Sequence, residues 1–201
     1  MPHGGTPDPK EWAPWTPEEA VAQLRGLNAP WHIAGGWALD LWQGKQTRPR
    51  YDLEIAVKSA AFSKVREALA GFDLFAAQDG RLEAIADQAT AARQYWVLDP
   101  AIRKWRLDIL LEPGDDQMWV YRRDPRVKAP LADVTATTPA GIPYLRPEAV
   151  LLFKAKDTRP KDERDFDLCA SLLDADARAW LRHALETAHP GHAWLSRLQG
   201  S

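Results

Sequence analysis

The chain has 201 residues, and 26 Lys and Arg against 28 Asp and Glu give it a formal net charge of −2 at pH 7. This length favours one domain, or one domain with a small appendage, and 45% of hydrophobic residues suffices for a core. The balanced charge argues against a nucleic-acid binder that depends on bulk positive charge, and the single cysteine excludes an internal disulfide framework. No apolar run approaches the roughly 20 residues that span a bilayer, and the first ten residues do not form a signal peptide, so we expect a cytoplasmic protein.

The beginning of the chain is rich in proline, and we interpret residues 1–15 as a loose leader. A helix is predicted to begin directly after it. Thr16 is a suitable N-cap, Pro17 suits the first helical position, and Glu19 completes a capping box with Thr16. The helical pattern ends at Gly26.

A glycine pair separates the next two predicted elements. Residues 31–34 form a short apolar segment bounded by breakers, which predicts a strand, and residues 37–42 predict a short helix that ends at Gly44. Residues 51–57 alternate between polar and apolar side chains, as is typical of a strand with one buried face. Later spacing predicts a helix over 59–71 and strands over 72–75, 94–98, 105–111 and 118–121, the last as hairpin partner of 105–111.

Only helical patterns follow Pro147. They predict helices over 148–156, 162–173 and 174–187 and a short helix near Trp194. Because strands and helices mix before this point, we expect an α+β fold with a mixed sheet, flanking helices and a helical C-terminal part. The expected division is a mixed domain over 1–147 and a helical region over 148–201.

Two carboxylates share one face of the strand predicted over 51–57. Residues i and i+2 of a strand point to the same side, so Asp52 and Glu54 emerge together on the face opposite the core residues Tyr51, Leu53, Ile55 and Val57. Like charges at this spacing repel each other unless a cation lies between them. Mg²⁺ commonly binds through one or two carboxylates and substrate phosphates. The alternative interpretation is a solvated strand face.

Three neighbouring features favour the metal-binding interpretation. Gly35 and Gly36 lie between a strand and a helix, where backbone amides without a nearby Cβ atom suit a phosphate group. Asp108 stands among apolar residues of the strand predicted over 105–111, where a carboxylate is paired, exposed or a metal ligand. The linker 44–50 places three basic residues directly before the acidic strand, where they suit a triphosphate as well as plain ion pairs.

This arrangement resembles the antibiotic-type members of the polymerase-beta-like nucleotidyltransferase superfamily, above all the aminoglycoside 2''-adenylyltransferases and the lincosamide nucleotidyltransferases. The resemblance rests on a glycine pair, a short helix and a strand with the pattern DxE, found here in residues 35–41 and 47–57. A later strand supplies a third carboxylate. The segments 152–156 and 159–165 are similar to the helical segment that follows the catalytic half of such proteins.

The resemblance implies an enzyme that transfers a nucleoside monophosphate from a nucleoside triphosphate onto a hydroxyl of a small molecule such as an aminoglycoside antibiotic. The expected donor is ATP, which would supply AMP, or another nucleoside triphosphate. Asp52 and Glu54 would hold two Mg²⁺ ions, and Asp108 would be the third ligand and help to deprotonate the acceptor hydroxyl. Gly35 and Gly36 would cradle the β- and γ-phosphates. The triphosphate tail would be held by basic residues, for which the candidates are Arg48, Lys154 and Lys156.

The chain departs from the superfamily pattern at three positions. Trp37 stands where many members have a serine that contacts a phosphate, and Arg50 stands where proteins of this type often carry histidine. Glu54 is one methylene longer than the commoner aspartate. None of these departures removes the carboxylate pair.

Two alternative functions stay open from the sequence. A toxin-type nucleotidyltransferase that modifies RNA or protein also carries a Lys-rich helix after its catalytic half, but the net charge of −2 and the lack of a basic or aromatic stripe argue against nucleic acid. A non-catalytic nucleotide-binding protein would keep the fold, and the intact carboxylate pair argues against it. The acceptor is not readable: an aromatic wall and ordinary core packing fit equally well for Trp96, Trp105, Trp119 and Tyr121.

Overall fold

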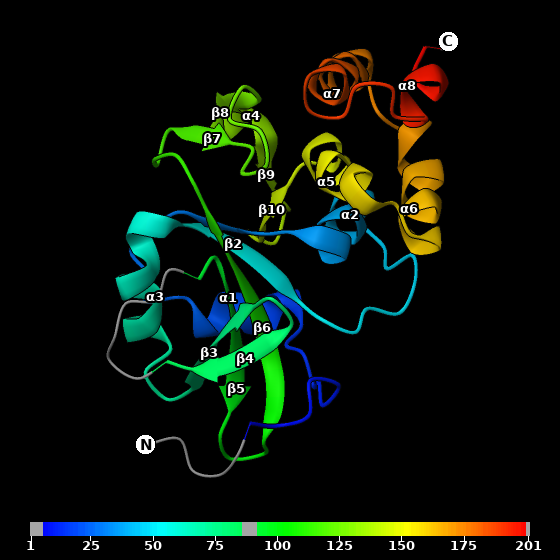
Figure 1. Cartoon of the computed structure of the whole chain (residues 1–201). Coiled ribbons are helices and arrows are strands. Elements are labelled where there is room, and N and C mark those ends of the chain that lie inside the picture. The colour runs from blue at the N-terminus through cyan, green and yellow to red at the C-terminus, as the bar shows by residue number, and fades with distance from the viewer. Residues whose placement is uncertain (1–5, 86–91, 200–201) are drawn as a thin grey trace.

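The structure is a computed structural model and describes residues 6–85 and 92–199. Its described part contains a mixed, mostly antiparallel sheet of eight strands in the order β4-β3-β5-β6-β2-β1-β10-β9, and a separate two-stranded ribbon of β7 and β8 (Figure 1). The strands are β1 (Trp31–Ile33), β2 (Glu54–Lys58), β3 (Asp73–Gln78), β4 (Arg81–Ala84), β5 (Gln94–Asp99), β6 (Lys104–Glu112), β7 (Met118–Val120), β8 (Lys128–Pro130), β9 (Thr135–Thr137) and β10 (Pro143–Leu145).

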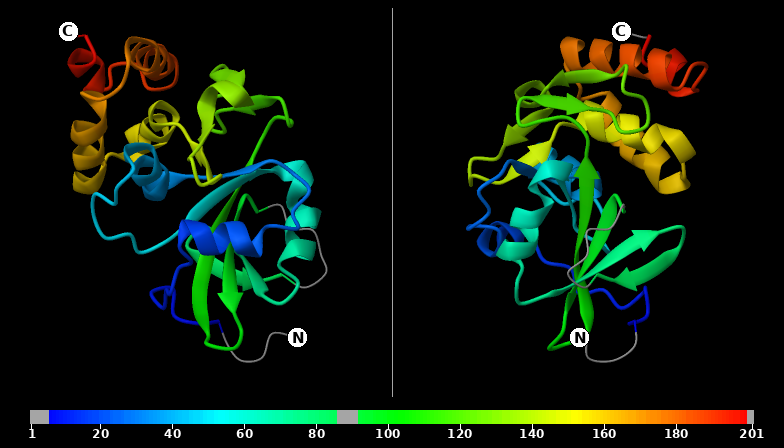
Figure 2. Two further views of the ribbon diagram at one scale, coloured as in Figure 1. Left: turned by 180° about the vertical axis from the view of Figure 1, so that it is seen from behind. Right: turned by 60° about the vertical axis from the view of Figure 1, so that its left-hand side comes forward.

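The helices lie around this sheet and beyond one end of it. They are α1 (Pro17–Gln23), α2 (Gly35–Gln43), α3 (Phe62–Ala68), α4 (Leu131–Val134), α5 (Pro147–Lys154), α6 (Pro160–Ala170), α7 (Ala175–Ala188) and α8 (Trp194–Arg197), with short 3₁₀ turns at Ser59–Ala61 and Ala155–Asp157. Helices α5 to α8 gather at the end of the molecule that also holds the β7–β8 ribbon, and β6 runs toward them from the end with β3 and β5 (Figures 1 and 2).

The centre of the sheet is the most deeply buried part of the fold. Strands β2 and β6 are parallel neighbours there, and the apolar side chains of both are almost fully inaccessible: Ile55, Val57, Leu107 and Ile109 are each at most 1% exposed. A central strand that is covered on both faces cannot shift its register without exposing its whole apolar set. Any residue on these two strands is therefore held in a fixed position.

The expected fold class is confirmed. The sheet is mixed, helices flank it, and every regular element from Pro147 onward in the described residues is helical. The predicted capping box is also present, because Thr16 Oγ1 accepts from Glu19 N at 3.2 Å and Glu19 Oε2 accepts from Thr16 N at 2.8 Å. The division into domains over 1–147 and 148–201 stays a prediction. No helix in the described part of the chain is long and apolar enough to cross a membrane.

The leader differs from its prediction. Residues 1–5 lie outside the described residues, but the end of the leader is tied to β6: Ala13 N donates to Trp105 O and Trp15 N to Arg106 O, both at 3.0 Å. Trp15 is also buried in the main core. Residues 13–15 are therefore part of the folded domain, because two backbone hydrogen bonds and a buried indole outweigh the irregular proline-rich sequence.

Two strand predictions also need correction. Tyr51 does not face the core; it is 77% exposed, because β2 begins only at Glu54 and the chain before it is irregular. Strand β7 does not return along β6 as its hairpin partner but pairs with β8, since the turn at 113–116 leads the chain away from the sheet. The short helix begins earlier than predicted, at Gly35. The aromatic residues Trp105, Trp119 and Tyr121 are fully buried, which decides for core packing against an aromatic wall.

A buried network of ion pairs joins the sheet-side loop to the C-terminal helices. Arg50 donates to both oxygens of Asp40 on α2 at 2.7 Å, and its Nη1 lies 3.7 Å from Asp165 on α6. Arg48 and Lys154 contact the same Asp165, at 3.1 and 2.9 Å. Because the side chains of Asp40, Arg50 and Asp165 are each at most 2% exposed, these pairs fix α6 and the end of α5 against α2.

Candidate active site

The parallel register of β2 and β6 places two of the predicted carboxylates side by side. Glu54 is the direct partner of Asp108 in this register, and Asp108 N donates to Leu53 O at 2.8 Å. Neighbouring strands lie about 4.8 Å apart, so both side chains leave the sheet from adjacent positions on one face. The third predicted carboxylate, Asp52, is exposed just before β2 begins. Asp52 and Glu54 thus lie where β2 begins, and Asp108 lies beside them in the middle of β6.

These carboxylates are in an electrostatically unfavourable environment. Burial, and then the charge of Asp52, raises the pKa of Glu54 above its ordinary value. Burial and the charge of Glu54 raise the pKa of Asp108 well above its ordinary value, against a hydrogen bond that Gln94 Nε2 donates to Asp108 Oδ2 at 2.7 Å. The other oxygen, Oδ1, is buried without a hydrogen-bond partner among the described residues. Both a proton and a cation would relieve this arrangement.

The glycine pair begins α2 directly above these acids. Gly35 has a φ of +58°, and a Cβ atom built on it would overlap the carboxylate of Glu54. A Cβ atom on Gly36 would overlap the guanidinium of Arg50. Glycine is therefore required at both positions, by the left-handed backbone at the first and by close packing at both. The resulting close approach puts the free backbone amides of a helix N-terminus beside Glu54, a suitable place for a phosphate.

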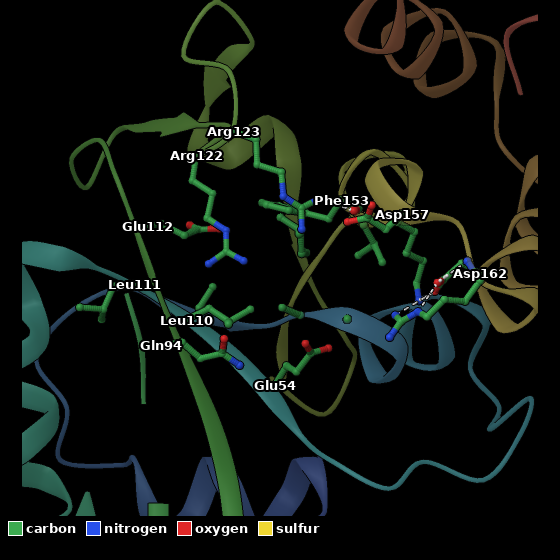
Figure 3. A pocket seen from close by; sticks show the side chains of 17 residues that line it. Glu54, Gln94, Leu110, Leu111, Glu112, Arg122, Arg123, Phe153, Asp157 and Asp162 are labelled. Carbon is green, nitrogen blue, oxygen red and sulfur yellow. Dashed lines mark hydrogen bonds and ion pairs between the residues drawn. The ribbon is translucent and has the colours of Figure 1, made fainter. Parts of the chain in front are cut away.

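A cavity of about 370 Å³ opens beside Glu54 (Figure 3), and neither Asp52 nor Asp108 belongs to its described lining residues. Figure 3 shows Glu54 and Gln94 at its base, Arg122 and Arg123 entering from the side of the β7–β8 ribbon, and Asp162 on the opposite side. The residues that line it are Ala34, Gly35, Glu54, Ala56, Gln94, Leu110, Leu111, Glu112, Arg122, Arg123, Leu145, Val150, Phe153, Lys154, Asp157, Arg159 and Asp162. The cavity therefore has a carboxylate base and basic groups on two sides.

Only one of the three predicted phosphate-binding residues, Arg48, Lys154 and Lys156, lines the cavity. Lys154 lines the cavity, where its Nζ contacts Asp162 and Asp165, both at 2.9 Å. Arg48 is paired with Asp165 and Lys156 with Asp157, and neither belongs to the lining residues. Of the three, Lys154 is thus the one that the fold brings to the cavity, and the roles of all three stay predictions.

Arg159 and Asp162 lie next to Lys154 on this side of the cavity. Arg159 Nε donates to Asp162 Oδ2 at 2.8 Å at the beginning of α6. Burial acts to raise the pKa of Asp162, but hydrogen bonds from Arg159 and Lys154 outweigh it and hold that pKa at about 2. Asp162 is consequently charged under ordinary conditions, and it fixes both cations at the edge of the cavity.

Sequence reasoning missed three lining residues. Gln94 begins β5, and it reaches Asp108 only because β5 and β6 pair antiparallel. Arg122 and Arg123 follow β7 and enter the cavity only because that ribbon folds over the end of the sheet. The sequence does carry a signal, the adjacent arginines after an apolar strand, but nothing in it gives the position of the ribbon.

The donor atoms at the base of the cavity suit a hard divalent cation. Glu54 and Asp108 offer carboxylate oxygens, the ligand type that Mg²⁺ prefers, and Oδ1 of Asp108 is buried beside its register partner Trp96. Within the described ranges, no three His, Cys, Asp or Glu side chains already form a group that could hold a metal. A bound Mg²⁺ would therefore be completed by oxygens of the substrate phosphates, as is common for this ion.

Comparison with known proteins agrees with this geometry. A family model described as aminoglycoside-2''-adenylyltransferase matches residues 18–135, which is more than half of the chain and includes both strands with the acids. No curated protein sequence matches the chain at a significant level.

Two solved structures share the fold. One is a crystal structure of ANT(2'')-Ia in complex with adenylyl-2''-tobramycin, with a TM-score of 0.55, 15% sequence identity, and coverage of 83% of this chain and 93% of that one. The other is lincosamide antibiotic adenylyltransferase LnuA with lincomycin bound, with a TM-score of 0.55, 18% identity, and coverage of 84% and 100%. The family match decides the assignment: the chain belongs to the aminoglycoside-2''-adenylyltransferase family and is a nucleotidyltransferase.

Proposed function

We propose that the protein transfers a nucleoside monophosphate, AMP from ATP, onto a hydroxyl of a small-molecule acceptor in a magnesium-dependent reaction. The acceptor oxygen forms a bond to the α-phosphorus, the bond from this phosphorus to the β-phosphate oxygen breaks, and pyrophosphate leaves with the electron pair. The hydroxyl proton passes to a carboxylate. An aminoglycoside is the acceptor class that the family indicates.

One observation carries this proposal: Glu54 lines a cavity beside Gly35 at the N-terminus of α2, and Asp108 lies in direct register with it on the neighbouring strand. Two carboxylates in such a position disfavour folding on their own account, because burial raises the pKa of both and the charge of Glu54 raises that of Asp108 further. Such carboxylates are useful where a bound cation must be held against the negative charge of phosphates. Mg²⁺ ions held by Asp52, Glu54 and Asp108 would supply that stabilisation for the phosphates and lower the pKa of the attacking hydroxyl.

The chain's own residues divide the remaining work. Gly35 at the beginning of α2 offers backbone amides to the phosphates, and Lys154 offers a charge on the same side. Gln94 fixes the orientation of Asp108 beside Glu54 by donating to Oδ2. Catalysis of this kind is mostly positioning and charge stabilisation.

The test is an assay of pyrophosphate release with Mg²⁺ and ATP in the presence of tobramycin, lincomycin and uncharged polyols. We expect release that depends on acceptor and is abolished by EDTA. Asp52→Asn and Glu54→Gln are expected to lower the rate at least a hundredfold, on the scale of removing an electrostatic catalytic group. Asp116→Asn serves as the control, because Asp116 is an exposed turn residue. Release that is unchanged by both acid substitutions would contradict the proposal.

A further inference from the structure

Arg122 is a cation of the cavity that has no direct ion pair among the described residues. It is partly buried and lines the cavity, yet it makes no hydrogen bond or ion pair that the described residues provide; its guanidinium carbon lies 5.9 Å from the ring centroid of Phe153. Burial and the charge of Arg123 lower the pKa of Arg122, and the charges of Asp108, Glu54 and Glu112 only partly offset this. A guanidinium kept in this state is a ready partner for an anionic ligand, since its planar fork matches carboxylate and phosphate oxygens.

The other basic groups of the cavity differ in this respect. Lys154 and Arg159 are both engaged by Asp162. They lie on the side of the cavity that Figure 3 marks with Asp162, whereas Arg122 and Gln94 lie on the far side of Glu54. The cavity thus has one basic side, where Asp162 pairs with Lys154 and Arg159, and a second one under the β7–β8 ribbon, where Arg122 has no direct ion pair among the described residues.

The geometry of the transfer reaction indicates which side of the cavity would hold the triphosphate tail and which would hold the acceptor. In an in-line displacement the attacking oxygen and the leaving group lie on opposite sides of the phosphorus. If the α-phosphate lies at Glu54 and the triphosphate tail extends to Gly35 and Lys154, as the proposed function has it, the acceptor enters from the opposite side. That side is the one lined by Arg122 and Gln94.

We propose that Arg122 recognises an anionic group of the acceptor, so that the preferred substrate is a hydroxyl-bearing carboxylate or phosphate ester and not a polycationic aminoglycoside. This inference rests on the proposed function for its assignment of sides and replaces only the acceptor class. The nearby carboxylate of Glu112 offers a polycation little: it is 3% exposed and is engaged by Lys58 at 3.5 Å and by the indole of Trp119 at 3.0 Å. Metal binding at Glu54 and Asp108 would make the region around Arg122 more positive still.

The experiment uses one hexose scaffold in three charge states: glucuronate, glucose and glucosamine. Each is titrated calorimetrically into the protein saturated with Mg²⁺ and α,β-methylene ATP, a nucleotide that cannot be cleaved at the reacting bond. We expect glucuronate to bind at least tenfold more tightly than glucosamine. Arg122→Met should weaken glucuronate about tenfold or more and leave the nucleotide affinity unchanged, and Arg122→Lys should retain part of the binding.

Arg126→Met is the matched control, because Arg126 lies four residues further on with a side chain that is 71% exposed. The inference is overturned if glucosamine binds as tightly as glucuronate, if glucuronate does not bind, or if Arg122→Met weakens the nucleotide and spares glucuronate. Pyrophosphate assays separate the two proposals. If tobramycin stimulates pyrophosphate release and Arg122→Met does not change that rate, the anionic acceptor is rejected and the transferase function is retained. If glucuronate binds in an Arg122-dependent way but no acceptor stimulates pyrophosphate release, the anion site is retained and the transfer reaction is rejected.

Discussion

Replacing Asp108 by asparagine is expected to make the metal-free protein more stable while it abolishes activity. Asp108 is 5% exposed and is the register partner of Glu54. Asparagine has nearly the same shape and still accepts the hydrogen bond that Gln94 donates at 2.7 Å. The substitution therefore removes one charge from a like-charged pair and changes little else in the packing.

The magnitude follows from the geometry of the two strands. Two unit charges about 5 Å apart repel each other by roughly 3 kcal/mol at an effective dielectric constant of about 20. The wild-type protein relieves part of this by holding a proton, so we expect a gain of about 1–3 kcal/mol in the free energy of unfolding. For a chain of this size, that corresponds to a rise of roughly 2–10 °C in Tm.

The gain should depend on pH with a definite sign. The raised pKa of Asp108 means that the folded protein binds a proton more tightly than the unfolded chain. Wild-type stability therefore falls as pH rises from about 4, the ordinary pKa of aspartate, through the raised pKa of the folded state. Asp108→Asn lacks this loss, so the difference in stability should be small near pH 4 and grow toward neutral pH.

Thermal unfolding in EDTA and in Mg²⁺ with α,β-methylene ATP measures both effects. We expect Asp108→Asn to have the higher Tm in EDTA and to gain less than the wild type from Mg²⁺ and nucleotide. Asp116→Asn, at an exposed turn, should follow the wild type in both conditions. A lower Tm for Asp108→Asn in EDTA at neutral pH would refute the reasoning, because it would mean that the charge of Asp108 stabilises the metal-free fold.

Two further predictions follow from the packing around the acids. Gly35→Ala should lower the turnover number at least tenfold and destabilise the fold by about 1–2 kcal/mol, because the φ of +58° disfavours a side chain and the new Cβ atom would displace Glu54. Gly26→Ala is the control in the same kinetic and urea-unfolding assays, because a Cβ atom at Gly26 meets nothing within 4 Å. Arg50→Met should cost about 3–5 kcal/mol in urea unfolding, since it leaves the buried carboxylate of Asp40 without its ion-pair partner. Arg182→Ala breaks an exposed pair on α7 and should cost less than about 1 kcal/mol. Equal costs for the two arginine substitutions would contradict a structural role for the buried network.

The acids could be predicted because strand periodicity determines which side chains share a face. The alternation from Glu54 onward and the apolar surroundings of Asp108 depend only on neighbours in the sequence, whereas Asp52 lies before β2 begins and outside the predicted strand geometry. The register that pairs Glu54 with Asp108 is a long-range property, but it follows from burying Ile55 and Ile109 together. The glycine pair was recognisable because its spacing before the acidic strand is characteristic.

The rest of the cavity depends on contacts between distant segments. Arg122 and Arg123 look like ordinary surface residues in the sequence, and only the fold of the β7–β8 ribbon brings them over the acids. The interpretation of 118–121 as a partner of β6 was wrong for the same reason, because a turn signal does not tell which strand pairs next. Arg48 likewise has the charge of a phosphate ligand, but Asp165, from a helix more than 100 residues later, engages it.

The central claim is that Asp52, Glu54 and Asp108 hold divalent metal together with the triphosphate. A crystal of the protein grown with Mn²⁺ and α,β-methylene ATP tests it directly through the anomalous signal of the metal. We expect an anomalous peak within ligand distance of all three carboxylates, with the β- and γ-phosphates at the beginning of α2 beside Gly35. A nucleotide bound elsewhere, or a metal that leaves Asp108 without contact, would contradict it.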